Sequence, residues 1–127
     1  MVNGERIYEI LGKLVSQWGE NLIGRHGFSL IGGVVAATYP EQGKILRELM
    51  PHSFFLVPGY GAQGGTANDL KHCFNKDKLG AIINSSRGII AAYRNEKYKK
   101  NYSELDFGQA ARVAAIDMRK DLQEVLS

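Results

Sequence analysis

Residues 57–66, with the sequence VPGYGAQGGT, contain the side chains and glycines best suited to binding an anion. Glycine allows main-chain N–H groups to approach a ligand closely, and the amide of Gln63 adds a side-chain donor. The segment also contains the pattern G-x-G-x-x-G, between an apolar run and an expected helix. Loops that bind dinucleotides have this pattern in this context. The first question is therefore which phosphate ligand the loop would hold.

A dinucleotide is disfavoured because the acidic partner of the motif is missing. The dinucleotide fingerprint needs an Asp or Glu about 20 residues further on, where it binds a ribose hydroxyl. No acidic residue lies between Leu79 and Arg94. The loop also follows the second expected strand, whereas the fingerprint normally follows the first strand of its fold. A mononucleotide or a sugar phosphate fits these residues better.

A second polar loop, Ser85-Ser86-Arg87-Gly88, follows the next expected strand. Its hydroxyls can donate hydrogen bonds, and a guanidinium can bind a phosphate through two parallel bonds. One glycine-rich loop and one arginine-bearing loop at adjacent strand ends describe the phosphate site of many TIM barrels. The alternative is that the glycines only form a tight turn and that Arg87 pairs with a surface carboxylate.

The elements around these loops alternate between strands and helices. Apolar periodicity predicts a first helix over residues 4–18 and a last helix that begins at Asp106. Between them, strands are expected at 30–37, 53–57 and 80–84, and helices from a T-x-x-E capping box at Thr38 and from Thr66. This alternation predicts an α/β protein with parallel strands, and ligands of such proteins bind at the carboxyl ends of the strands.

Composition narrows the class of protein. The chain has 127 residues, 44% of them hydrophobic, which favours one globular domain. The apolar runs are too short to span a bilayer, no signal peptide is evident, and the single cysteine forms no internal disulfide, so we expect a cytoplasmic protein. The net charge of +3 and the basic, tyrosine-rich segment 93–102 are too weak a signal for nucleic-acid binding. No spacing of His and Cys predicts a metal site.

Three consecutive segments resemble orotidine 5′-phosphate decarboxylase, in particular its longer bacterial branch. They are GGVVAATYPEQGKILRELMP, SFFLVPGYGAQGGTANDL and GAIINSSRGIIAAY, and the similarity runs over residues 27–93. The resemblance implies that residues 1–127 are a single segment, about the last three βα units of a TIM barrel. It also implies conversion of orotidine monophosphate (OMP) to uridine monophosphate (UMP) in pyrimidine biosynthesis, by a lyase without a cofactor.

The resemblance assigns roles to individual residues. Gln63 and Arg87 would bind the 5′-phosphate, with the backbone of Gly64, Gly65 and Gly88 nearby. Further residues would form the loops around the substrate: Thr38, Pro58, Gly59, Tyr60, Gly61 and Ser86. Tyr60 would approach or close over the pyrimidine. The implied ligands are OMP, UMP, phosphate or sulfate. Ala36 departs from the glycine that the family commonly has there.

The catalytic motif of the family, D-x-K-x-x-D, does not occur in this sequence. A complete barrel has about 250 residues, so a chain of this length would cover only a part of it. We therefore expect no catalytic residue in this chain and no activity on its own. Two alternatives remain: a non-catalytic nucleotide- or sugar-phosphate-binding module, and one chain of a split decarboxylase. Because a partial barrel exposes strand edges and an apolar face, we also expect a homo-oligomer or a partner that supplies the amino-terminal half-barrel.

Overall fold

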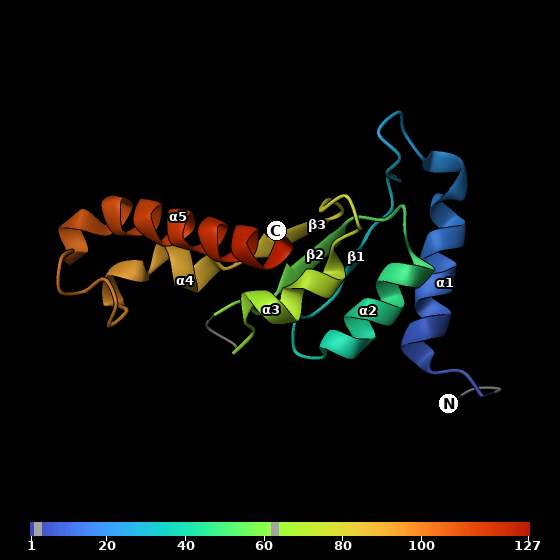
Figure 1. Ribbon diagram of the computed structural model, residues 1–127, viewed down its shortest axis with the longest axis horizontal. Helices are drawn as coiled ribbons and strands as arrows, with labels where there is room; N and C mark the ends of the chain where they lie inside the picture. The colour runs from blue at the N-terminus through green and yellow to red at the C-terminus, as the bar shows by residue number, and fades with distance from the viewer. Residues whose placement is uncertain (2–3, 62–63) are drawn as a thin grey trace.

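A computed structural model describes residues 1, 4–61 and 64–127. The α-helices are α1 (Ile7–Gly19), α2 (Pro40–Leu49), α3 (Ala67–Leu70), α4 (Ser86–Ile90) and α5 (Phe107–Leu126). The strands are β1 (Gly33–Val34), β2 (Phe55–Pro58) and β3 (Ala81–Asn84). Short 3-10 helices occur at η1 (Glu20–Leu22), η2 (Lys71–Cys73), η3 (Ala92–Arg94) and η4 (Glu104–Asp106). The sheet lies near the middle of an elongated molecule, between α1 and α2 at one end and α4 and α5 at the other (Figure 1).

The described strands form one parallel sheet in the order β1-β2-β3. This arrangement confirms the predicted α/β class. The strand expected over 30–37 is shorter in the structure, where β1 spans only Gly33–Val34. Its hydrogen bonds to β2 nevertheless continue, since Val35 N donates to Leu56 O (3.0 Å) and Ala37 N to Pro58 O (3.2 Å).

Local chemistry explains where two of the helices begin. Pro40 is the first residue of α2, where its missing N–H costs nothing. The N-cap is therefore Tyr39, and the predicted capping box at Thr38 is wrong by one residue. The start at Thr66 is confirmed: its hydroxyl accepts a hydrogen bond from Asp69 N, while the Asp69 carboxylate accepts one from Thr66 N. This reciprocal pair satisfies two donors at the start of α3.

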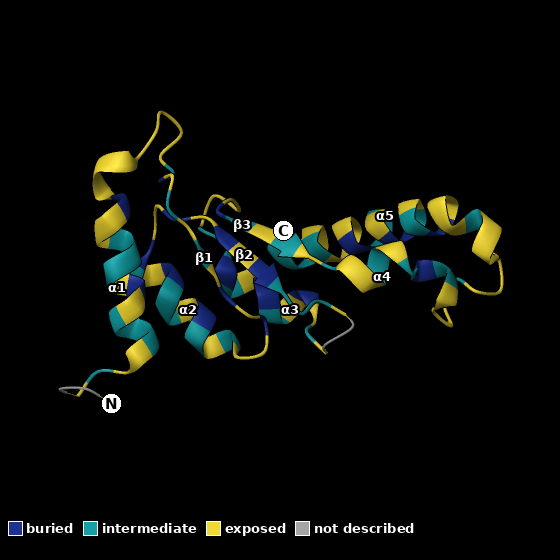
Figure 2. Cartoon of the chain, turned by 180° about the vertical axis from the view of Figure 1, so that it is seen from behind, coloured by how far each residue is buried: buried dark blue, intermediate teal, exposed yellow. Residues whose placement is uncertain are grey.

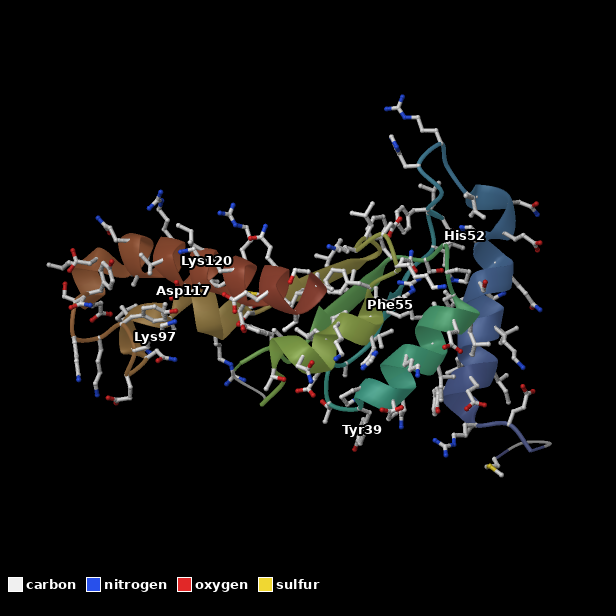
Figure 3. The ribbon with its side chains drawn as sticks, viewed as in Figure 1. Tyr39, His52, Phe55, Lys97, Asp117 and Lys120 are labelled. Atoms are coloured by element: carbon white, nitrogen blue, oxygen red, sulfur yellow. The ribbon has the colours of Figure 1, made fainter. Side chains whose placement is uncertain are left out.

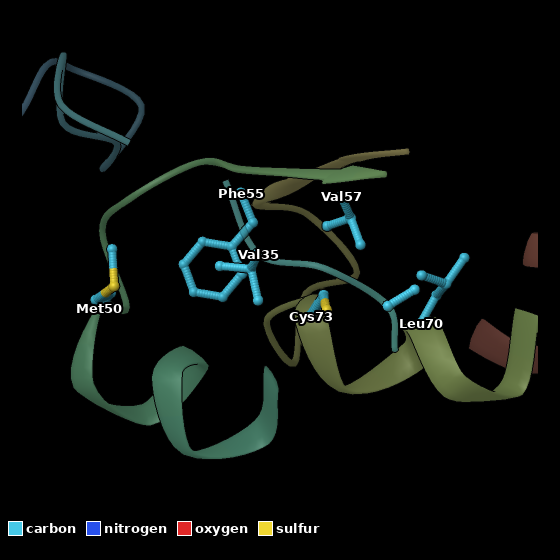
Figure 4. Close-up of a cluster of buried hydrophobic side chains, with 7 residues drawn as sticks. Val35, Met50, Phe55, Val57, Leu70 and Cys73 are labelled. Carbon is cyan, nitrogen blue, oxygen red and sulfur yellow. The ribbon is translucent and has the colours of Figure 1, made fainter. Parts of the chain in front are cut away.

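The main core lies between the sheet and the helices that cover one of its faces (Figure 4). Its fully buried centre consists of Phe55 and Val57 of β2 with Leu70 of α3. The other buried members are Val35, Ala37, Met50 and Cys73. Buried residues gather at β2 and α3, while exposed and buried residues alternate along α1 and α5 (Figure 2). The main core of the described chain therefore lies where β2 packs against α2 and α3.

The opposite face of the sheet carries an exposed row of apolar side chains. Val34 pairs with Leu56, and Leu56 pairs with Ile82, so the three side chains lie side by side across the strands. They are 71%, 41% and 56% exposed, respectively. Solvated apolar side chains in this number are unusual on one face of a parallel sheet, which is normally covered on both sides. We call Val34, Leu56 and Ile82 the exposed row.

The carboxyl-terminal helix forms a second, smaller core with the segment that precedes it. Ala110 and Ala114 of α5 are buried against Ala92, and three partly buried tyrosines pack around them: Tyr93, Tyr98 and Tyr102. The small alanines allow the tyrosine rings to approach the helix closely. In the described part of the chain, no helix combines the length and the apolar character needed to cross a membrane.

Candidate anion-binding site

The glycine loop and the segment after β3 meet at the carboxyl ends of β2 and β3, where they line a cavity of about 110 Å³. The loop predicted at Ser85-Ser86-Arg87-Gly88 is wrong in part, because α4 already begins at Ser86. The glycine loop contributes Pro58, Gly59 and Tyr60. The loop after β3 and the first turn of α4 contribute the remaining lining: Asn84, Ser85, Ser86, Arg87 and Gly88. The parallel pairing of Pro58 with Asn84 places both loops at the same edge of the sheet. The two segments that carry the predicted site residues therefore share a cavity.

The glycine loop adopts backbone angles that side chains disfavour. The φ angles of Gly59, Gly61 and Gly64 are +108°, +72° and +84°. Only glycine adopts this region of backbone space readily, so the glycines are required by the shape of the loop. Gly65 has a different constraint, because a Cβ atom there would lie 2.8 Å from Gly59 O and 3.0 Å from Ala37 Cβ. The close approach closes the loop against the end of β1.

The side chain of Arg87 is exposed, and within the described chain it forms no ion pair. The ion pairs there join Lys13 to Glu5, Lys97 to Asp117 and Lys99 to Glu96. The alternative in which Arg87 pairs with a surface carboxylate therefore finds no support in the described residues. A guanidinium at the rim of a small cavity is suited to binding an oxyanion.

Three main-chain donors of the glycine loop are already used within the loop. Gly61 N donates to Gly65 O (2.9 Å), Gly64 N to Gly61 O (2.9 Å) and Gly65 N to Gly59 O (3.1 Å). The amino-terminal end of α3, which the sequence suggested as a further anion contact, instead holds the carboxylate of Asp69. The hydroxyls after β3 also donate within the protein, from Ser85 Oγ to Tyr60 O (3.3 Å) and from Ser86 Oγ to Asn84 Oδ1 (3.2 Å). The exposed guanidinium of Arg87 is the more accessible donor.

A larger cavity of about 880 Å³ lies beside the small one, between the two loops, α4 and α5. Tyr60, Ser85, Arg87 and Gly88 line both cavities. The Tyr60 hydroxyl donates a hydrogen bond to Asp121 Oδ2 of α5 (2.5 Å). Burial, followed by this hydrogen bond, raises the pKa of Tyr60 above its usual value. The phenol therefore stays protonated and remains a donor at neutral pH.

A second tyrosine–aspartate pair lies one turn earlier on α5. The Tyr98 hydroxyl donates to Asp117 Oδ2 (2.9 Å), and Lys97 Nζ lies 2.7 Å from the same oxygen (Figure 3). The hydrogen bond from Lys97 lowers the pKa of Asp117, and it raises the pKa of Lys97. The basic segment that resembled a weak nucleic-acid signal thus packs in part against α5.

The structure brings together some of the predicted site residues and separates others. Pro58, Gly59, Tyr60, Ser86, Arg87 and Gly88 line the small cavity, and Gly61 lines the larger one. Thr38 lies in an exposed turn after β1. Gly64 and Gly65 shape the loop, and neither is among the described lining residues. Gln63, the side chain expected to bind phosphate with Arg87, lies outside the described residues.

Sequence reasoning missed two features of this region. The contact between Tyr60 and Asp121 joins residues 61 positions apart, and no local pattern signals it. The bond from Ser85 Oγ to Tyr60 O (3.3 Å), which ties the two loops together, was also not expected. Among the described residues, no group of three or more His, Cys, Asp or Glu side chains is placed to hold a metal ion.

Comparison with known proteins relates this arrangement to one family, although no protein-family model matches the chain. The chain is 42% identical over 127 residues to an orotidine 5′-phosphate decarboxylase of Caldicellulosiruptor bescii, covering 100% of this chain and 40% of that protein. It is 40% identical over 122 residues to the orotidine 5′-phosphate decarboxylase of Rhodopirellula baltica, of which it also spans 40%.

Solved structures give the same relationship. The fold matches that of Leishmania donovani UMP synthase with a TM-score of 0.71 and 27% identity, over 99% of this chain and 24% of that chain. It matches Leishmania donovani OMP decarboxylase with a TM-score of 0.66 and 26% identity, over 97% of this chain and 41% of that chain. The three parallel strands correspond to part of the TIM barrel of these enzymes. The chain is therefore a homologue of orotidine 5′-phosphate decarboxylase that spans about 40% of the length of its bacterial relatives.

Proposed function

We propose that residues 1–127 form the phosphate-binding part of an orotidine 5′-phosphate decarboxylase, which converts OMP to UMP in pyrimidine biosynthesis. The observation that carries the proposal is the cavity shared by the glycine loop and the first turn of α4, which carries Arg87. In this role Arg87 and Gln63 bind the 5′-phosphate of OMP or UMP, while Gly64, Gly65 and Gly88 allow the loops to approach it. Ser86 supplies a hydroxyl at the rim, and the rest of the loop residues form the walls.

The chemistry of the reaction explains why a phosphate site matters far from the reacting carbon. Binding energy from a remote, unreactive phosphate can stabilise the transition state at the pyrimidine. The residues of this chain would supply that energy, whereas the D-x-K-x-x-D motif that the family uses at the reacting carbon is missing from the sequence. We therefore expect that the 127-residue chain binds UMP but does not decarboxylate OMP.

Isothermal titration of UMP against the chain and its variants tests the proposal. Arg87→Ala should weaken binding by about tenfold or more, since charge-assisted hydrogen bonds are the strongest polar contacts. Gln63→Ala should also weaken it. Arg112→Ala is the matched control, because Arg112 is an exposed arginine of α5 outside the lining of the small cavity. Equal affinity in the wild type and Arg87→Ala would remove the proposed site.

The exposed row indicates that the chain functions with a further protein surface packed on its sheet. Val34, Leu56 and Ile82 lie on a sheet face that is open in the described residues. Burial of such a face stabilises a protein, so the chain should function together with further strands, from additional sequence or from another chain, or as a homo-oligomer. A polypeptide that carries the D-x-K-x-x-D strand should restore OMP turnover when it is mixed with the chain.

Two outcomes of that mixing experiment distinguish the alternatives. Restored turnover, lost again in Arg87→Ala, supports a decarboxylase assembled from two parts. UMP binding that is never accompanied by turnover supports a non-catalytic nucleotide-binding module. Turnover by the chain alone, abolished by a substitution within it, would contradict the expectation that it is inactive by itself.

A further inference from the structure

Tyr60 contacts three separate parts of the site, and it does so with different groups. Its hydroxyl donates to Asp121 Oδ2 of α5 (2.5 Å), and its carbonyl accepts a hydrogen bond from Ser85 Oγ (3.3 Å). Its backbone also pairs with Gly65 across the glycine loop in an isolated parallel bridge. One residue thus connects the glycine loop to the loop after β3 and to the carboxyl-terminal helix.

The surroundings of Tyr60 explain why the loop needs such a connection. Gly59 and Gly61 flank it with φ angles of +108° and +72°, and neither has a side chain that could anchor the backbone. Glycine loses more conformational freedom on ordering than any other residue, so a loop of glycines is costly to hold in one shape. The contacts of Tyr60 restrict the loop before any ligand is present.

We propose that Tyr60 is a positioning residue of the anion site, which holds the glycine loop in its binding shape through α5 and Ser85. This inference rests on the proposed phosphate-binding function and deepens it. Tyr60 lines both cavities together with Arg87, so a displacement of its backbone would change the distance between the loop and the guanidinium. The anion itself does not need to contact the phenol for this role.

The bond to Asp121 has a second consequence for the charge of the site. Asp121 and Arg87 line the same large cavity, and a carboxylate that paired with Arg87 would compete with a bound phosphate. The Tyr60 hydroxyl occupies Oδ2 of Asp121, and Arg87 forms no ion pair among the described residues. Tyr60 therefore keeps the glycine loop in place. Its neutral hydroxyl also binds the Asp121 carboxylate, which leaves Arg87 available for a phosphate.

The test compares two tyrosine variants that each lose one hydroxyl bonded to an aspartate of α5. Tyr60→Phe should weaken binding of UMP and of inorganic phosphate by about fivefold in isothermal titration, the effect of one lost hydrogen bond. Tyr98→Phe, which loses the matching bond to Asp117, should leave both affinities unchanged. Thermal unfolding tests whether each variant is folded. Comparison of their melting temperatures with that of the wild type shows whether a loss of affinity accompanies a general loss of stability.

A double-mutant cycle with Arg87→Ala separates positioning from a general structural effect. If Tyr60 acts by placing the loop relative to Arg87, Tyr60→Phe should cost little further affinity once Arg87 is removed. Additive losses, or equal affinity in Tyr60→Phe and the wild type, would overturn the inference while leaving the phosphate site intact. Failure of the phosphate site itself would appear separately, as equal binding by the wild type and Arg87→Ala.

Discussion

The guanidinium carbon of Arg47 lies 3.9 Å from the centroid of the Phe55 ring, at the end of the sheet opposite to the anion site. Arg47 is only 6% exposed. It donates hydrogen bonds to Cys73 O (3.2 Å), Gly80 O (3.1 Å) and Ser53 O (2.7 Å), and also to Met50 O. A single side chain thus joins the end of α2 to η2 and to the starts of β2 and β3.

We predict that Arg47→Met destabilises the chain by about 3 kcal/mol or more, because it leaves several buried carbonyls without a donor. Arg47→Lys should also destabilise it, since an ammonium group cannot reproduce the planar arrangement of donors. Chemical denaturation measures both changes. Arg112→Met, at an exposed position of α5, is the control and should change the free energy of unfolding by less than about 0.5 kcal/mol. A similar small effect at Arg47 would show that these bonds contribute little.

Gly65→Ala should disturb the glycine loop, because its Cβ atom would lie 2.8 Å from Gly59 O, closer than the two atoms can approach. We expect a loss of about 1–3 kcal/mol in stability and weaker UMP binding. Gly108→Ala provides the contrast, since nothing lies within 4 Å of the added atom near the start of α5. Alanine favours helix, so that variant should gain up to about 1 kcal/mol. Calorimetric melting and titration of UMP together report both effects.

Burial of the Cys73 thiol raises its pKa to about 11. At neutral pH the folded chain should therefore react with a thiol reagent about 300-fold more slowly than the unfolded chain, because only the thiolate reacts. Rates of labelling with and without denaturant measure this ratio. Equal rates would mean that Cys73 is accessible in solution.

The same shift predicts a pH dependence of stability. An unfolded cysteine ionises near its ordinary pKa of about 8.5, whereas the folded thiol stays protonated up to about pH 11. Between these values the unfolded state binds fewer protons, so stability should fall as the pH rises through this window. Cys73→Ala removes this contribution. Its free energy of unfolding should decline less steeply between pH 8 and 11 than that of the wild type.

The exposed row should make the chain associate with itself at high concentration. We predict a concentration-dependent increase in apparent mass in sedimentation experiments, because association buries Val34, Leu56 and Ile82. Ile82→Lys should shift the equilibrium toward the monomer. Leu105→Lys should not, although Leu105 is 92% exposed, because it lies in η4 away from the sheet. A monomer at all concentrations would contradict this prediction.

Much of the fold follows from local signals in the sequence. The strands at 53–57 and 80–84 and the helix start at Thr66 all depend on periodicity or on neighbours within three residues. The first helix depends on periodicity too, but its predicted start at residue 4 is wrong, because the helix begins at Ile7. Thr38 was misassigned because the proline that follows two positions later moves the helix start to Pro40. The apolar pattern of residues 30–37 also predicts a longer strand than the two residues of β1, Gly33–Val34.

The site was predictable only in part, because some of its contacts join residues that are distant in sequence. Parallel strands with polar residues at their carboxyl ends predict that the glycine loop lies near Arg87, and residues of both segments line the small cavity. Arg47 and the pair of Tyr60 and Asp121 were missed because their partners are distant in sequence. A buried arginine has the same residue type as a solvated one, so only the packed structure shows which role it has.

The spatial order of the strands is also their order along the chain. Each new strand can therefore add to the free edge of the one made before it, as the polypeptide leaves the ribosome. Each strand that emerges can pair with a strand that has already formed. No strand therefore has to stay unpaired until a later part of the chain is made. The sheet can grow vectorially during synthesis, and α5, which carries the Asp121 partner of Tyr60, would complete the anion site last.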